Sequence, residues 1–156
     1  MRFIVDVMLG SLAKWLRILG HDTLYNPSFS DDELFFKAHL ENRVLLTRDK
    51  ELAARVREDL CLYIQSKKLK DQLKQVFTCF PNFSEENIFT RCVLCNNLVK
   101  PVPKNEVRGR VPEYVFNSVE IFYYCNKCDK IYWEGSHIEH VKSFLIELRR
   151  SQHAER

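Results

Sequence analysis

Two pairs of cysteines carry the clearest chemical signal in the sequence. Cys92 and Cys95 form one C-x-x-C pair, Cys125 and Cys128 form a second, and 29 residues separate the two pairs. Each pair can present two thiolates from one tight turn, and two such turns give the tetrahedral sulfur shell that Zn²⁺ prefers. A shell of four thiolates leaves no open position for a reactant, so we expect a structural zinc. The separation exceeds the usual spacing of about 15 to 20 residues, which indicates an extended hairpin, with disulfides or inert thiols as the alternatives.

Three aspartates make a second candidate site. Asp6 ends the apolar run at the start of the chain, Asp49 lies two residues past the run RVLLT, and Asp31 lies in the first turn of a predicted helix. If the runs are parallel strands, all three acids lie at the carboxyl edge of one sheet, where α/β proteins bind ligands. Asp22 and Asp59 precede strands and therefore lie on the opposite edge. The pattern selects three acids out of many.

Carboxylates that converge in this way repel one another, and a hard divalent cation relieves that repulsion. We expect Mg²⁺ or Mn²⁺, with Asp6 and Asp49 as direct ligands, Asp31 as a ligand or an orienter of water, and Asp32 as a weaker candidate. The chemistry this predicts is in-line hydrolysis of a phosphodiester. Three basic side chains are accessory candidates that would steady the scissile phosphate: Lys14, Arg17 and Arg48.

Each of these residues also has a structural interpretation. Asp31 and Asp32 would stabilise the start of a helix through its dipole, and Asp49 would serve as a helix cap. Lys14 and Arg17 are typical of solvated charges on a helix. Asp6 is harder to explain structurally, because an acid directly after a buried parallel strand usually has a partner or a ligand.

The elements that would position these side chains alternate between strand and helix. A helix follows each predicted strand: the first ends at Gly20, the second opens with a Ser30-x-x-Glu33 capping box, the third runs from Asp49 to Leu60, and the fourth contains Leu69 to Phe77. Such alternation predicts an α/β fold with a mostly parallel sheet covered by helices on both faces. The predicted strands are residues 2–6, 23–25, 43–47 and 61–64.

The alternation stops before residue 90, and we place a boundary there. Residues 91–134 contain the cysteine pairs and short strand-like pieces, and residues 135–156 form a closing helix and tail. A unit of this size buries too little surface by itself, so zinc would supply much of its folding free energy. Four aromatic residues surround the second pair, as the ribbon core or as a surface that stacks on bases: Tyr123, Tyr124, Tyr132 and Trp133.

Composition and charge exclude several classes of protein. Hydrophobic residues make up 46% of the chain, with four glycines and five prolines, so a collagen-like or disordered chain is excluded. No unbroken apolar run is long enough for a signal peptide or a membrane span, and we expect a soluble, cytoplasmic protein without a membrane partner. The net charge of +3 hides an acidic segment, 1–41, followed by a basic one, 42–75. That division suits a metal-dependent enzyme acting on a polyanion, or ordinary solvated charge.

Several motifs in order resemble the Mut-seven carboxy-terminal RNase domain family. They are VDVMLGSLAKWLRILGHD at 5–22, SDDEL at 30–34, RVLLTRD at 43–49, RCVLCN at 91–96 and YYCNKCDKIYWEGSH at 123–137. The resemblance implies a PIN-like three-layer nuclease fold over residues 1–90 joined to a zinc ribbon. It also implies metal-dependent endonucleolytic cleavage of RNA, single-stranded or structured, with Asp6, Asp31 and Asp49 at the family's acidic positions.

One departure from the wider PIN pattern affects the expected activity. PIN nucleases commonly carry a fourth acid after a later strand, where this chain has Gln65, Ser66, Lys67 and Lys68. Three acids would hold one ion firmly and a second only with substrate, which would weaken the activity. Two other functions fit the same residues: a catalytically silent RNA-binding module, and a receiver-like phosphoacceptor domain.

Overall fold

The computed structural model describes residues 1–154, with only the backbone of Ser136 and His137. It divides into two compact units, residues 1–96 and residues 97–156, which are described separately.

The first unit is built on a parallel sheet of four short strands in the order β2-β1-β3-β4. The chain leaves β1 for β2 on one side and returns past β1 to β3 on the other, so β1 and β3 flank the point where the strand order reverses. Ligands of open α/β sheets bind at this point. The strands are β1 (Arg2–Val5), β2 (Asp22–Leu24), β3 (Val44–Thr47) and β4 (Cys61–Tyr63).

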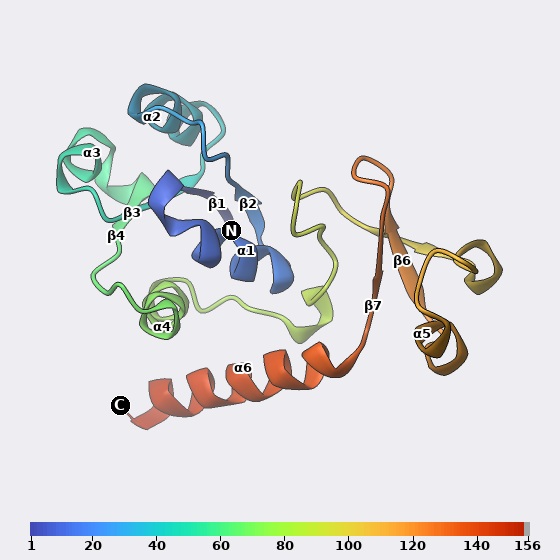
Figure 1. Cartoon of the computed structure of the whole chain (residues 1–156). Helices are drawn as coiled ribbons and strands as arrows, with labels where there is room; N and C mark the ends of the chain where they lie inside the picture. The colour runs from blue at the N-terminus through green and yellow to red at the C-terminus, as the bar shows by residue number, and fades with distance from the viewer. Residues whose placement is uncertain (155–156) are drawn as a thin grey trace. The chain divides into compact units, whose positions relative to one another are not determined.

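Helices cover both faces of this sheet, which confirms the predicted three-layer α/β architecture. One pair, α1 and α4, packs together on one face, and α2 and α3 lie on the other (Figure 1). This is the arrangement that right-handed crossovers give, because the connection from β1 to β2 runs opposite to the two that follow. The helices are α1 (Gly10–Ile18), α2 (Asp31–Leu40), α3 (Lys50–Arg55) and α4 (Leu69–Cys79); 3₁₀ turns precede α1 (Val7–Leu9), β4 (Glu58–Leu60) and the link to the second unit (Glu85–Asn87).

Burial on both faces explains why the strands read as continuous apolar runs. All four residues of β3 are buried, and Ile4 and Leu45 pack against α2 and α3 through Leu34 and Leu52. Neighbouring strand residues such as Phe3 and Leu46 are fully buried as well. The sheet therefore holds its carboxyl ends on a rigid base.

One helix is shorter than the sequence pattern predicts. The helix after Asp49 was expected to reach Leu60, but α3 ends at Arg55 and Val56 is extended, with ψ at 145°. The four residues of β3 span about 13 Å, whereas a helix from Lys50 to Leu60 would span about 16 Å. A short helix followed by a 3₁₀ turn returns the chain to the start of β4 and still buries Val56 and Leu60 in the core.

The second unit is an antiparallel sheet with two helices. Its strands are in the order β5-β6-β7, and α5 packs through Val115 against Val107 and Phe122 to form a small core. The stretch between the cysteine pairs therefore contains a helix, and the prediction of an extended hairpin was wrong; the 29 residues fold into a core of their own. The elements are β5 (Lys100–Val102), a 3₁₀ turn (Lys104–Glu106), α5 (Glu113–Ser118), β6 (Phe122–Cys125), β7 (Lys130–Trp133) and α6 (Ser136–Ala154).

Candidate active site and metal centre

Asp6 is buried where β1 ends. It is 2% exposed, and its backbone N–H donates to the carbonyl of Leu46 at 3.0 Å, so the ladder with β3 fixes its position. Its Oδ1 accepts from the Val7 amide at 2.7 Å, and its Oδ2 accepts from the Thr47 hydroxyl at 2.6 Å. Among the side chains that the structure describes, no basic one forms an ion pair with this carboxylate. A buried carboxylate held only by neutral donors is a suitable ligand for a cation.

Asp49 lies beside the same hydroxyl at the start of α3. Its Oδ1 accepts from the amides of Glu51 and Leu52 at 2.9 and 3.1 Å, which makes it the helix cap that the sequence allowed. Its own backbone N–H donates to Thr47 Oγ1 at 2.9 Å. The Thr47 hydroxyl thus accepts from Asp49 and donates to Asp6, and it ties the two acids that follow neighbouring strands.

Asp31 and Asp32 are exposed in the first turn of α2. The capping box predicted at Ser30 and Glu33 is present, so this turn is well defined. Asp32 pairs with Arg55 at 2.7 Å, and both side chains are largely solvated.

The three predicted acids do not form a tight cluster. Among the described residues, the four cysteines are the group in which three or more ligand-type side chains bring their ligand atoms within 4.8 Å of one another. Asp6 and Asp49 follow the adjacent strands β1 and β3, and the Thr47 hydroxyl links the Asp6 carboxylate to the Asp49 backbone, but among the described residues no such proximity joins all three acids.

The basic candidates differ in their surroundings. Lys14 is exposed on α1. Arg17 is 5% exposed, and its guanidinium donates to the carbonyls of Thr23 and Val93 at 2.9 Å, so the interpretation of Arg17 as a solvated helix charge was wrong. Burying a guanidinium requires such acceptors, and these backbone carbonyls supply them. Arg48 donates through Nη1 to the carbonyls of Ile64 and Gln65 at 3.0 and 2.6 Å, and it thereby holds the loop that follows β4.

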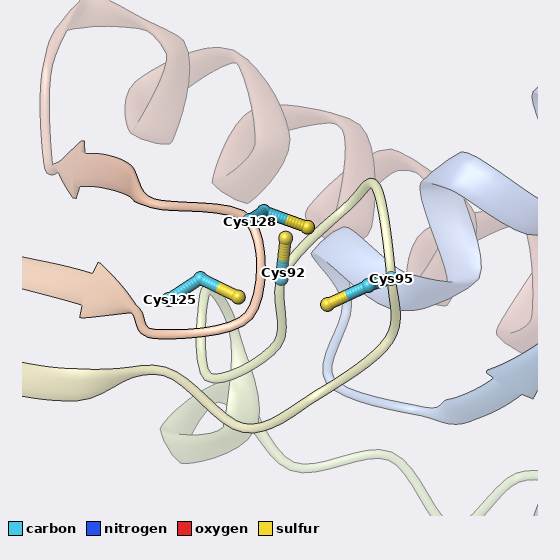
Figure 2. Close-up of side chains that lie close together, drawn as sticks. All are labelled: Cys92, Cys95, Cys125 and Cys128. Atoms are coloured by element: carbon cyan, nitrogen blue, oxygen red, sulfur yellow. The ribbon is translucent and has the colours of Figure 1, made fainter.

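The four cysteines form a cluster suited to zinc. Their sulfur atoms point toward one another (Figure 2) and lie within 4.8 Å of one another. A tetrahedral ion with Zn–S bonds of about 2.3 Å needs sulfurs about 3.8 Å apart. The residue after each pair, Asn96 or Asp129, has a left-handed φ of 72° or 52°. Both pairs are thus wrapped by a tight turn, and the donor set of four thiols fits Zn²⁺.

The aromatic residues of the second unit divide between core and surface. Trp133 packs against the core and meets Phe122 edge to face at 6.4 Å. The Tyr124 hydroxyl instead donates to Asp129 at 2.8 Å, and Arg110 lies over the Tyr124 ring at 5.6 Å. The interpretation as ribbon core is therefore confirmed for Trp133, and base stacking stays a prediction for the others.

Sequence patterns do not indicate the polar network at the amino-terminal edge of the sheet. Arg43 is 6% exposed and donates to Asp22 Oδ1 at 2.8 Å, and the Asn96 amide donates to the same oxygen at 2.7 Å. Burial alone would raise the pKa of Asp22, but these hydrogen bonds and the charge of Arg43 lower it to about 2. The partners of Asp22 lie 21 and 74 residues away in the chain, and no local pattern reveals them.

Comparison with known families identifies the chain from nearly its whole length. The model of the Mut7-C RNAse domain matches residues 1–145, which include all three acids and all four cysteines. The chain belongs to the Mut7-C RNAse domain family. No curated protein matches it. Membership of the Mut7-C family points to a nuclease, with RNA as substrate or partner. Within the described part of this Mut7-C chain, no helix has the length and apolar character needed to cross a membrane.

Proposed function

We propose that this protein is a metal-dependent RNA endonuclease whose acidic site lies at the carboxyl edge of the parallel sheet. The observation that carries the proposal is the link from the Asp6 carboxylate through the Thr47 hydroxyl to the backbone N–H of Asp49, where the adjacent strands β1 and β3 end. Membership of an RNase-domain family supports this over a receiver-like phosphoacceptor domain.

The roles of the residues follow from their surroundings. Asp6 and Asp49 would hold Mg²⁺ or Mn²⁺, since both offer carboxylate oxygens and Asp49 Oδ2 makes no hydrogen bond among the described residues. When bound, the ion would polarise the scissile phosphate and make hydroxide available near neutral pH. Asp31, exposed at the start of α2, would orient the attacking water, with Asp32 beside it as a weaker candidate. Lys14, which is exposed, would steady the phosphate, whereas Arg17 is held by backbone carbonyls.

The second unit would contribute to RNA binding through paired basic and aromatic side chains. Arg108 lies over the Phe116 ring at 4.7 Å, Arg110 over Tyr124 at 5.6 Å, and Lys130 over Tyr132 at 5.1 Å. Basic groups beside aromatic rings suit a polyanion with stacking bases. The cysteine-bound zinc would hold this unit in shape.

One observation favours a second candidate, a catalytically silent RNA-binding module. The three acids do not converge within 4.8 Å, and Gln65 to Lys68 stand where a fourth acid would be expected. Such a module would bind RNA in a salt-sensitive manner and release no metal-dependent product.

The test uses circular single-stranded RNA with Mn²⁺, because only an endonuclease can linearise a substrate without ends. D6N and D49N should each lose about a hundredfold or more in rate, since even neighbours of metal ligands typically contribute about 10- to 100-fold. Asparagine keeps the shape at both positions and is a good helix cap, so both variants should fold. D59N, at an exposed acid on the opposite edge, is the matched control and should cut normally. Cutting by D6N at the normal rate, or a wild-type protein that binds RNA without cutting it, would refute the proposal.

A further inference from the structure

A polar pocket lies at the amino-terminal edge of the sheet, away from the three acids. It has a volume of about 390 Å³, within the range of small-molecule sites. Its lining includes Arg2 and Asp22, which begin β1 and β2, and Asn82 and Asn87 from the segment that follows α4. Gly20 completes the wall; it has a φ of +88°, and a Cβ there would lie 2.1 Å from the Asn87 carbonyl oxygen.

Two nitrogen atoms of the residues that line this pocket are buried and make no hydrogen bond in the described structure: His21 Nε2 and Arg91 Nε. His21 is only 9% exposed, and its ring is held by edge and tilted contacts to Phe3, Phe77 and Phe83. Buried polar groups are almost always paired, so two in one pocket indicate a missing partner. An arginine N–H can only donate, and the partner that Arg91 lacks is therefore an acceptor.

The charges around the pocket favour an anionic acceptor. Asp22 is the one acid among the residues that line it, and its carboxylate is already held by Arg43 at 2.8 Å and Arg2 at 3.4 Å. Arg91 donates through Nη1 to the Asn96 carbonyl at 2.9 Å, which fixes its guanidinium, and its positive charge helps to lower the pKa of Asp22. Burial, together with nearby positive charges that include Arg91, lowers the pKa of His21 to about 4. Burial is the larger cause of this shift, and only the part that comes from the positive charges of Arg91 and the amino terminus favours an anion.

We propose that this pocket binds a phosphate group, with His21 and Arg91 as buried donors and Asn82 and Asn87 at its rim. A phosphate offers several oxygen acceptors to convergent donors, and neutral imidazole donates from Nε2 in one of its two tautomers. The volume leaves room for an attached nucleoside, so the phosphate belongs either to a free nucleotide or to the end of an RNA chain. The site is separate from the acidic edge and does not depend on the proposed nuclease activity.

The experiment follows the His21 imidazole by NMR in the full, zinc-loaded chain while inorganic phosphate is added. The His21 signals should shift, and those of His39 on α2 should not. N82D places a negative charge at the exposed rim and should weaken phosphate binding about tenfold or more, as expected for like charges a few ångströms apart. N105D makes the same change at an exposed position of the second unit and should bind as the wild type does. H21F keeps a ring against its three aromatic neighbours but removes Nε2, and it should also bind less tightly.

Three further arms identify the source of the phosphate, and all are run without Mg²⁺ or Mn²⁺ so that no RNA is cut. They are adenosine 5′-monophosphate, a 5′-phosphorylated RNA oligonucleotide, and the same oligonucleotide with a 5′-hydroxyl. Tighter binding of the monophosphate than of the oligonucleotides supports a nucleotide site, and a preference for the phosphorylated end supports an RNA-end site. Unchanged His21 signals in every phosphate arm, or equal binding by N82D and N105D, would overturn the proposal.

Discussion

Aspartates at the two edges of the parallel sheet have opposite kinds of partner. At the amino-terminal edge, Asp22 is held by Arg43 and Asn96, and Arg2 lies 3.4 Å away. At the carboxyl edge, Asp6 is more deeply buried, but among the described residues it accepts only from the Val7 amide and the Thr47 hydroxyl. An acid neutralised by arginine stabilises the fold, whereas an acid held by neutral donors keeps its charge available for a cation. The partners, rather than the residue type, separate structure from chemistry here.

The largest effect that tests this comparison is expected from the buried ion pair. Removing Arg43 in R43M leaves Asp22 with only the weaker contact to Arg2, and we expect a loss of about 3 to 4 kcal/mol in the free energy of unfolding, the lower part of the range for broken buried pairs, because Asp22 is partly exposed. R57M breaks the exposed pair with Asp59 and should change stability by less than about 1 kcal/mol. Denaturant unfolding measures both. Equal losses in the two variants would show that the greater burial of the pair between Arg43 and Asp22 adds nothing to stability.

The next effect is the pH dependence of the free energy of unfolding that His21, at the amino-terminal edge, produces. Folded His21 has a pKa of about 4 against 6.5 in the unfolded chain, so only the unfolded chain takes up a proton between these values. The contribution of neutral His21 to the free energy of unfolding is fully present above pH 6.5, and it falls by up to about 3 kcal/mol as the pH drops to 4. The loss tied to Asp22 comes later, below its ordinary pKa of 3.8. Unfolding measured from pH 7 to 4 should show the fall in the wild type and a flatter profile in H21F; parallel profiles would contradict it.

A smaller effect is expected at the carboxyl edge, from the Thr47 hydroxyl. T47V removes the hydroxyl that links Asp6 to Asp49, and we expect RNA cleavage to fall about 10- to 100-fold, the usual contribution of groups that orient metal ligands. T47S keeps the hydroxyl and should restore most of the rate. T78V, at an exposed threonine of α4, is the control. If T47V cuts as fast as T78V, the link has no part in catalysis.

The helices and strands could be predicted from the sequence better than the contacts that their side chains make. Continuous apolar runs in β1 and β3 and the capping box at Ser30 are local signals, because burial on both faces and helix caps depend on near neighbours. The cysteine spacing predicted the zinc cluster for the same reason. The length of α3 was not predictable in this way, because it depends on the distance back across the sheet.

Long-range partners explain what the sequence could not reveal. Arg17 is one helical turn from Ala13 and falls on the buried face of α1, but its acceptor at Val93 is 76 residues away. The same holds for His21, whose burial depends on Phe77 and Phe83. At the candidate site, chain order identified Asp6 and Asp49, but the Thr47 hydroxyl that links them became visible only in three dimensions.

The outer side of β2 has a consequence for how the chain avoids self-association. This strand lies at the margin of the sheet, where unpaired amides and carbonyls can recruit a strand from another molecule. Here the Thr23 N–H is taken by the Asn96 side chain at 2.9 Å, and the Thr23 carbonyl is taken by Arg17. Two side chains from outside the sheet thus make the hydrogen bonds that a fifth strand would make. At Thr23, the backbone of β2 has no unpaired group that could bind a strand of another molecule.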